Sequence, residues 1–203
     1  MGNPRVVLWD VGGVLLSNGW EESFRAEAAR SFHFDLTEFE RRHAKLMDPM
    51  ERGQISLDDY LKETLFYEPR PFQPREVRAF IESCSTPRAD VIEIARKVAA
   101  TGRYLSACLN NEGRDLNEYR LTHFGLRSFL TLFFSSCFTG RRKPEVRAYE
   151  LPLGVLGRPA EEVVFVDDRL ENLEPARRLG MRAVHCDSPN QLADDLRAAG
   201  VRW

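Results

Sequence analysis

The sequence predicts an α/β fold: a mostly parallel sheet with helices on both faces, interrupted by a helical insertion. A short apolar run stands near the N-terminus, a purely helical stretch follows it, and helix-like and strand-like segments then alternate from residue 87 onward. Such alternation is typical of βαβ units, whose parallel sheets are covered on both faces. One strand before the helical stretch and several after it indicate a core of residues 1–16 and 86–203 and a helical subdomain of residues 17–85.

The first element expected is a buried strand over Arg5 to Trp9, RVVLW. The run is short and rich in β-branched residues, and glycine stops it, which favours a strand that leads into a tight loop. The strand ends in Asp10, and Gly12 and Gly13 follow. This glycine pair has neither the GxGxxG nor the GxxxxGK[ST] spacing, so we do not expect a nucleotide-binding loop.

The second part, from about residue 20 to residue 84, predicts about four helices because its apolar residues recur every three or four positions. The segments are EESFRAEAARSF, LTEFERRHAKLM, SLDDYLKETLF and PREVRAFIESC. Asp35 or Thr37, Ser56 and Pro74 are suitable residue types for helix starts. No strand-like pattern interrupts this stretch, so it should form a helical subdomain.

The third part alternates between the two kinds of element. The helical segments are ADVIEIARKVAATG, DLNEYRLTHFG, PEVRAYELPLGVLG, LENLEPARRLG and PNQLADDLRAAG. The strand segments are RYLSACLNN, a part of LTLFFSSCFTG, VVFVDD and MRAVHCD. Together with the first strand they predict a Rossmann-like sheet.

Composition excludes several classes of protein. Hydrophobic residues make up 43% of the chain and charged residues 30%, which is ordinary for a globular protein. The net charge of -2 argues against a nucleic-acid partner, which would require a basic excess. No apolar window reaches the roughly 18 to 20 residues of a membrane span, and the N-terminus does not resemble a signal peptide. The four cysteines form no CxxC pair, so we expect reduced thiols and a cytoplasmic protein.

Polar residues follow the predicted strands at the points where the strands end. In open parallel sheets, ligands bind beyond these carboxyl ends. The residues expected at this edge are Asp10, Asn110, Asn111, Lys143, Asp167 and Asp168, with Asn172 one turn later.

This set of side chains suits phosphate chemistry. The carboxylates of Asp10, Asp167 and Asp168 repel one another unless a hard cation lies between them, and oxygen ligands suit Mg²⁺. Lys143 adds a second positive charge, so the Asp10 carboxylate could attack phosphorus and form an aspartyl-phosphate that water then cleaves. Each motif in isolation is better explained as a turn, a helix cap or a solvated loop. Their joint order favours the chemical interpretation.

The motifs WDVGGVL, LNN, RRKPE and FVDDRLEN resemble, in that order, the four motifs of the haloacid dehalogenase-like hydrolase superfamily. The resemblance spans nearly the whole chain and implies that the helical insertion is a cap of the C1 type. Within it, Glu51 to Ser56, ERGQIS, is similar to cap sequences of bacterial sugar-phosphate phosphatases. The same segment is similar to the N-terminal phosphatase domain of soluble epoxide hydrolases. The chain also resembles glucose-1-phosphatase-like members of the superfamily.

The resemblance implies a Mg²⁺-dependent phosphatase that acts on small phosphorylated metabolites. Asp10 would be the nucleophile, and Lys143 would be the lysine of the third motif. Asp168 would bind the metal directly, and Asp167 directly or through water. The implied metal site consists of Asp10, the carbonyl of Gly12, Asp167 and Asp168, with Asn172 behind the ligands.

Two positions depart from the family pattern. Many phosphatases of the family carry a second aspartate at the position of Gly12, where it acts as general acid and base, although the glucose-1-phosphatase-like group also has glycine there. The second motif has Leu109 where a serine or threonine normally binds phosphate. The amide of Asn110 and the nearby backbone N–H groups could replace it, and Asn111 is the second candidate for substrate binding.

Three alternatives keep part of this interpretation. The departures at Gly12 and Leu109 would also suit a degenerate member that senses a phosphate ligand or serves as a scaffold. A haloacid dehalogenase would use an Asp nucleophile without metal, but the pair Asp167 and Asp168 favours a metal. A phospho-receiver domain places its acidic pair first in the chain, which is the wrong order.

Overall fold

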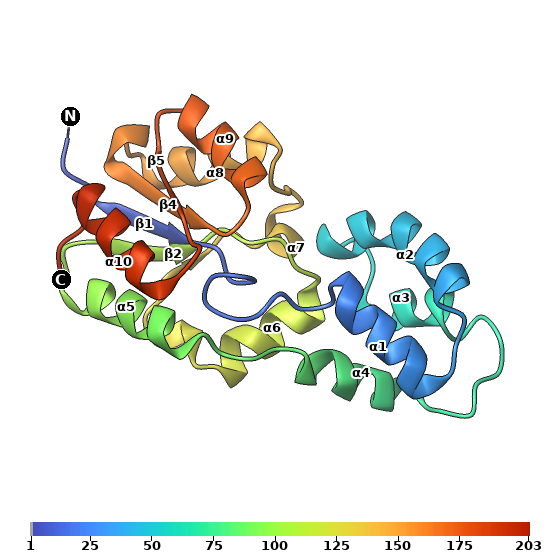
Figure 1. Cartoon of the computed structure of the whole chain (residues 1–203). Coiled ribbons are helices and arrows are strands. Elements are labelled where there is room, and N and C mark those ends of the chain that lie inside the picture. Colours follow the sequence, from blue (N-terminus) through green and yellow to red (C-terminus); the bar gives the residue numbers. More distant parts are fainter. Residues whose placement is uncertain (1) are drawn as a thin grey trace.

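Five parallel strands form the sheet of the protein in the computed structural model, which describes residues 2–203 (Figure 1). The strands are β1 (Val6–Trp9), β2 (Leu105–Cys108), β3 (Leu132–Phe133), β4 (Val163–Asp167) and β5 (Arg182–His185), in the order β3-β2-β1-β4-β5. The predicted α/β fold with a parallel sheet is therefore confirmed. The central strand is β1, so the residue that follows it lies in the middle of the carboxyl edge.

Helices cover both faces of this sheet. The first four helices after β1 are α1 (Glu22–Phe32), α2 (Leu36–Glu51), α3 (Leu57–Thr64) and α4 (Pro74–Ser83). The helices that accompany the sheet are α5 (Ala89–Ala100), α6 (Arg114–His123), α7 (Ser136–Thr139), α8 (Val146–Leu156), α9 (Leu170–Arg178) and α10 (Pro189–Ala198). In Figure 1, α5 and α10 lie on one side of the strands, and α8 and α9 lie on the other.

Strand β1 is buried on both of its faces. Val7 and Trp9 pack in one apolar cluster, and Val6 and Leu8 pack in another on the opposite face. Successive side chains of a strand point to opposite faces, so a strand buried on both sides reads as a continuous apolar run. This burial is the reason that VVLW could be predicted as a strand.

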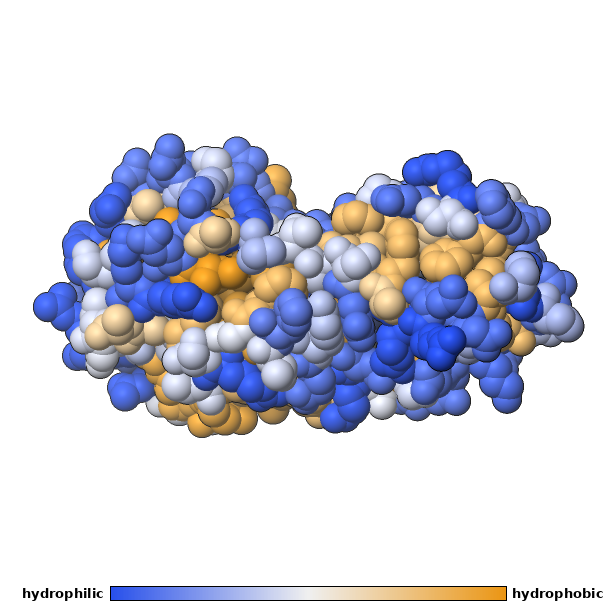
Figure 2. All heavy atoms as spheres, turned by 90° about the horizontal axis from the view of Figure 1, so that it is seen from below, coloured by the Kyte–Doolittle hydropathy of each residue, from blue (hydrophilic) through white to orange (hydrophobic). Residues whose placement is uncertain are grey.

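The helices α1 to α4 form a separate lobe in Figure 1, and their apolar cluster also includes Leu116 of α6. The surface narrows between this lobe and the lobe that contains the sheet (Figure 2). The predicted helix starts are confirmed: Asp35 accepts hydrogen bonds from the N–H groups of Thr37 and Glu38, and Ser56 forms a capping box with Asp59. Proline at the first turn of α4 suits a position that needs no N–H donor.

Residues 130–140 contain the predicted strand and also a short helix that was not predicted. LTLFFSSCFTG contains the two-residue strand β3, and the short helix α7 follows it within the same segment. Helix α7 ends at Gly140, which adopts φ 67°. Within residues 2–203, no helix is both long and apolar enough to cross a membrane.

A buried histidine makes the helical lobe sensitive to acid. The Tyr60 hydroxyl accepts a hydrogen bond from Trp20 Nε1 at 2.9 Å and lies 2.8 Å from His43 Nδ1. A neutral His43 can accept the Tyr60 proton at Nδ1, whereas a protonated His43 has only donors to offer. Burial, helped by the charge of Arg25, lowers the pKa of His43 to about 4.

We predict that acid destabilises the protein through this residue. The unfolded histidine takes up its proton near the ordinary pKa of about 6.5, before the folded one does, so the free energy of unfolding should fall as the pH drops from 7 toward 4. His43→Gln should show a shallower fall, measured by urea unfolding at a series of pH values, whereas His123→Gln, at an exposed site, should behave like the wild type. Equal slopes for all three proteins would contradict the prediction.

Candidate active site

The carboxyl edge of the sheet gathers the three predicted aspartates. Trp9, the last residue of β1, pairs with Val166 of β4. The next residues along the two neighbouring strands are Asp10 and Asp167, so they lie at the same edge of the sheet. Asp10, Asp167 and Asp168 each offer a carboxylate oxygen, and these oxygens lie within 4.8 Å of one another. The adjacency of β1 and β4 therefore produces the cluster that the sequence predicted.

Lys143 connects two of these carboxylates. Its Nζ lies 2.9 Å from Asp10 Oδ2 and 2.5 Å from Asp167 Oδ2, and the residue is 3% exposed. Asn111 holds the lysine backbone from both sides: its Nδ2 donates to the Lys143 carbonyl at 2.8 Å, and its Oδ1 accepts from the Lys143 N–H at 2.9 Å. Asn111, expected as a substrate-binding residue, thus positions the lysine as well.

Asp167 is fully buried and held by several donors. Asn172 Nδ2 donates to its two oxygens at 3.0 and 3.2 Å, and the N–H of Arg169 donates to Oδ1 at 2.8 Å. The Tyr149 hydroxyl donates to the Asn172 carbonyl at 2.7 Å. Asn172 therefore lies behind the carboxylates and fixes the orientation of Asp167.

Burial dominates the electrostatics of the site. It raises the pKa of Asp10 to about 8, against the opposing effect of Lys143 and with a further contribution from Asp167 and Asp168. Burial disfavours the Lys143 ammonium, but its contacts with Asp10 and Asp167 outweigh burial and raise its pKa. The pKa of Asp168 is also raised, first by burial and then by the charge of Asp167. One lysine does not balance three neighbouring carboxylates, so the site has excess negative charge.

The donor set fits a magnesium ion. Carboxylate oxygens are the ligands that this hard cation prefers. Asp168 Oδ1 is buried and has no hydrogen-bond partner among residues 2–203, which is costly for a carboxylate unless a ligand satisfies it. These observations favour a cation between Asp10, Asp167 and Asp168.

Gly13 lets the loop after β1 approach Asp168 closely. The residue adopts φ +74°, in the left-handed region, and a Cβ at this position would overlap the Asp168 carboxylate. A side chain here would therefore move both the loop and the third carboxylate.

The structure directs Asn110 away from the cluster. Its Nδ2 donates to Asn117 Oδ1 at 3.0 Å, its Oδ1 accepts from the Ser135 hydroxyl at 2.8 Å, and the residue is 2% exposed. Leu109 is also buried, in the apolar cluster on one face of the sheet. The amide of Asn110 is thus occupied within the core, and the turn after β2 contributes Asn111 rather than Asn110 to the cavity.

A cavity of about 360 Å³ opens over the carboxyl edge, between the sheet and the helical lobe. Asp10, Gly12, Asn111 and Lys143 line it from the sheet side. The lining from the helical lobe and the segment before it includes Trp20, Arg25, His43, Met47, Met50 and Glu51. Both parts of the chain therefore line one cavity.

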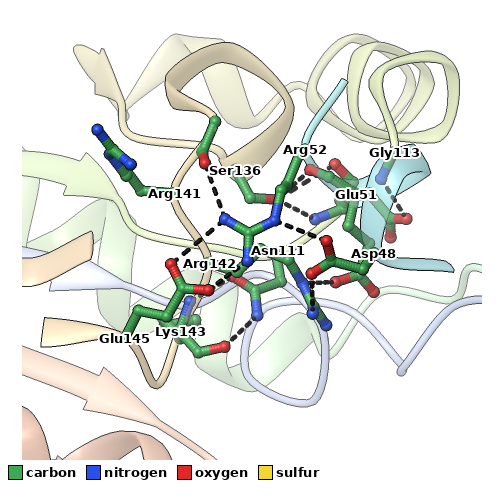
Figure 3. A network of polar contacts seen from close by, with 12 residues as sticks. Asp48, Glu51, Arg52, Asn111, Gly113, Ser136, Arg141, Arg142, Lys143 and Glu145 are labelled. Carbon is green, nitrogen blue, oxygen red and sulfur yellow. Dashed lines mark hydrogen bonds and ion pairs between the residues drawn. The ribbon is translucent and has the colours of Figure 1, made fainter. Parts of the chain in front are cut away.

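Charged residues that the motif analysis did not assign also lie here. Arg142 Nε donates to Glu51 Oε2 at 2.5 Å, and its Nη1 donates to Asp48 at 2.8 Å (Figure 3). Arg52 pairs with Asp48 at 2.8 Å and with Glu145. These pairs join the end of α2 to the loop that carries Lys143. In the sequence, only its position next to Lys143 indicated that Arg142 would lie near the site.

The chain is similar in sequence to known proteins. The family model described as haloacid dehalogenase-like hydrolase matches residues 4–180. A sesquiterpene phosphatase from Aspergillus oryzae is 27% identical over 184 residues, which cover 89% of each chain. A drimenol cyclase from Aspergillus calidoustus is 47% identical over 194 residues, which cover 89% of this chain and 33% of the relative.

The fold also resembles solved structures. The magnesium complex of a HAD family enzyme from Bacteroides thetaiotaomicron superposes with a TM-score of 0.77 at 17% identity. The similarity covers 91% of this chain and 93% of the other.

We predict that Gly13→Ala destabilises the protein more than a glycine replacement of equal backbone strain. Gly102 also has a positive φ, +66°, but no atom lies within 4 Å of its Cβ position. Gly102→Ala should therefore cost about 1–2 kcal/mol, which is the backbone term alone. Gly13→Ala should cost more because it also displaces Asp168, and urea unfolding of both variants measures the difference. Equal losses would show that Asp168 is not held against this loop.

Proposed function

Because this chain belongs to the haloacid dehalogenase-like hydrolases, we propose that it hydrolyses small phosphate monoesters with Asp10 as the nucleophile and Mg²⁺ as the cofactor. The observation that carries the proposal is the buried contact of Asp10 with Lys143, beside Asp167 and Asp168. A carboxylate in such a place has little structural value, because burial of like charges destabilises a fold. The arrangement of these charged groups suits the binding of an anionic substrate and a cation.

The proposed reaction has two steps. A carboxylate oxygen of Asp10 attacks phosphorus, the bond to the leaving-group oxygen breaks, and an aspartyl-phosphate forms. Water then attacks phosphorus, and the bond to Asp10 breaks, which releases phosphate. Lys143 contacts Asp10 directly, so its ammonium favours the ionised nucleophile and offsets the charge of the incoming phosphate.

Other residues hold these groups in place. We assign Asp10, the Gly12 carbonyl, Asp167 and Asp168 to the metal and Asn172 to the support of Asp167. Mg²⁺ bound there would keep the carboxylates ionised and draw negative charge from the phosphate oxygens. Asn111 fixes Lys143, and it lines the cavity, so it can also contact the phosphate. The turn of Asn110 and Asn111 would contribute backbone N–H groups to phosphate binding.

We also propose that residues 17–85 serve as a cap over the active site. Trp20, Met47 and Met50 bring apolar surface to a cavity whose floor is charged. A substrate with an apolar organic group on its phosphate would match both parts. The name of the sesquiterpene phosphatase relative supports testing an isoprenoid monophosphate together with sugar phosphates.

The alternative of a phosphate-binding protein without turnover rests on Gly12 and Leu109. Leu109 is part of the apolar core, so it offers no donor to a substrate. The alternative predicts that the protein binds Mg²⁺ and phosphate but releases no product.

Four buried free cysteines are consistent with the reducing cytoplasm that we expect for either function.

The first test is phosphate release from p-nitrophenyl phosphate, acetyl phosphate, sugar 1-phosphates and an isoprenoid monophosphate. We expect Mg²⁺-dependent release that EDTA abolishes and that Asp10→Asn lowers by at least about 10³-fold, because the amide is no nucleophile. Asp194→Asn, which removes an exposed aspartate of α10, is the matched control. Release by Asp10→Asn at the wild-type rate would exclude Asp10 as the nucleophile.

A second prediction concerns the cation. A ligand that binds only the folded state stabilises it, so Mg²⁺ should raise the melting temperature of the wild type and of Asp194→Asn. In Asp168→Asn the rise should be lost at the same Mg²⁺ concentration, because one of three carboxylates is missing. An equal rise in all three proteins would mean that Mg²⁺ binds elsewhere.

A further inference from the structure

The proposed reaction leaves one proton unassigned. An alkyl phosphate expels an alkoxide unless a proton reaches the leaving oxygen, and general acid catalysis is worth about 10² to 10⁴ in rate. Gly12, in the loop next to the nucleophile, has no side chain to supply that proton. The inference below rests on the proposed function and extends it to the source of this proton.

The space beside Gly12 is taken by the side chain of Arg120. A Cβ on Gly12 would lie 3.6 Å from Arg120 Nη1 and 3.3 Å from Asn18 Oδ1. Gly19 also faces the guanidinium, and a Cβ there would overlap it. Because residues 12 and 19 are glycines, the guanidinium of Arg120, from α6, can pack against the loop after β1. Both Gly12 and Arg120 line the cavity over Asp10.

Arg120 is held rigidly, although it carries a charge and is only 2% exposed. Its Nε donates to the Ser85 hydroxyl at 3.0 Å, and its Nη2 donates to the Ser17 carbonyl at 3.1 Å. Its Nη1, the atom that faces Gly12, donates to Glu112 Oε2 at 3.0 Å. One guanidinium nitrogen therefore both contacts the Glu112 carboxyl and lies beside Gly12. Arginine keeps its proton in proteins, so Arg120 cannot be the acid itself.

Glu112 has the surroundings of a group that exchanges protons. It follows Asn111 in the turn after β2, lines the cavity with Asp10 and Lys143, and is buried. Its Oε1 accepts from the Gly113 N–H at 3.0 Å. Burial raises the pKa of Glu112 to about 7; Arg120 opposes the rise and Glu51 adds to it. Near neutral pH, both the protonated and the ionised forms are then available.

The other carboxyl groups around the cavity are less suited to this role. Asp10 is the proposed nucleophile. Glu51 is tied to Arg142 at 2.5 Å. Glu22 is exposed, and Glu21 lies beside it at the start of α1. Glu112 is the buried carboxyl of the cavity lining, within residues 2–203, that the proposed metal site and nucleophile do not use.

We propose that Glu112 is the proton donor and acceptor of the reaction, held by Arg120 toward the side of the cavity that Gly12 leaves open. In the first step, the leaving oxygen takes the proton of the Glu112 carboxyl as its bond to phosphorus breaks. In the second step, the Glu112 carboxylate takes a proton from the water that attacks the aspartyl-phosphate. Glu112 is then protonated again, and Asp10 and inorganic phosphate are released.

The test compares two leaving groups in Glu112→Gln. Hexyl phosphate needs a proton on its leaving oxygen, whereas the p-nitrophenolate of p-nitrophenyl phosphate leaves without one. We expect kcat/KM for hexyl phosphate to fall about 10²- to 10⁴-fold, and kcat/KM for p-nitrophenyl phosphate to change by less than about tenfold, because no proton is needed in its first step. The slower second step should appear as a burst of p-nitrophenol. The alkaline limb of the kcat/KM pH profile for hexyl phosphate, where Glu112 loses its proton near pH 7 in the wild type, should disappear.

Two further variants separate catalysis from folding. Glu118→Gln, which removes the surface ion pair between Glu118 of α6 and Arg127, should keep both activities. Gly12→Asp in the Glu112→Gln background should restore hexyl phosphate turnover, because a carboxyl at residue 12 would enter the same space beside Arg120.

The outcomes are distinct. An equal loss of kcat/KM for both substrates, with no rescue by Gly12→Asp, would assign Glu112 a structural role and overturn the inference. Unchanged hexyl phosphate turnover in Glu112→Gln would also overturn it, while the proposed function would stand. No Mg²⁺-dependent release from either substrate by the wild type would overturn the proposed function and the inference together.

Discussion

The contact of one lysine with two carboxylates at the middle of a parallel sheet is the constraint on which the site depends. Asp10 follows β1, Asp167 is the last residue of the adjacent strand β4, and Lys143 Nζ lies 2.9 Å from Asp10 and 2.5 Å from Asp167. Charged groups in so dry a place cost folding free energy unless they are paired, and three carboxylates exceed what one ammonium can balance. The excess is acceptable in an enzyme that binds a cation and an anionic substrate at this position.

The surrounding fold makes this arrangement rigid. Strand β1 is packed on both faces, so the backbone that leads into Asp10 is held in place. Asn111 clamps the backbone of Lys143, and Asn172 and the Arg169 N–H fix Asp167. Oriented groups of this kind do not have to reorganise when charge develops in a transition state, which is the main source of electrostatic catalysis.

The helical lobe is tied to the same residues. Arg142, next to Lys143, pairs with Asp48 and Glu51 at the end of α2, so the loop of the lysine and the lobe share one set of ion pairs. On the other side of the cavity, Arg120 of α6 reaches the loop after β1 through Gly12 and Gly19. Both contacts lie where the two lobes meet, so the proposed access of substrate and the proposed proton transfer would depend on this meeting.

The sequence by itself determined the sheet, the helical insertion and the residues at the strand ends. Apolar runs such as VVLW and cap residues such as Ser56 act locally, and the order of the strands brings Asp10 to Asp167. Only the tertiary structure decided in which direction the other side chains around the site point and which groups they contact. Asn110 faces Asn117 rather than the cavity, and Arg120 fills the space at Gly12 and meets Glu112. The approach of Arg120 to Gly12 depends on how α6 packs against the loop after β1, about a hundred residues earlier in the chain, and no local pattern encodes that packing.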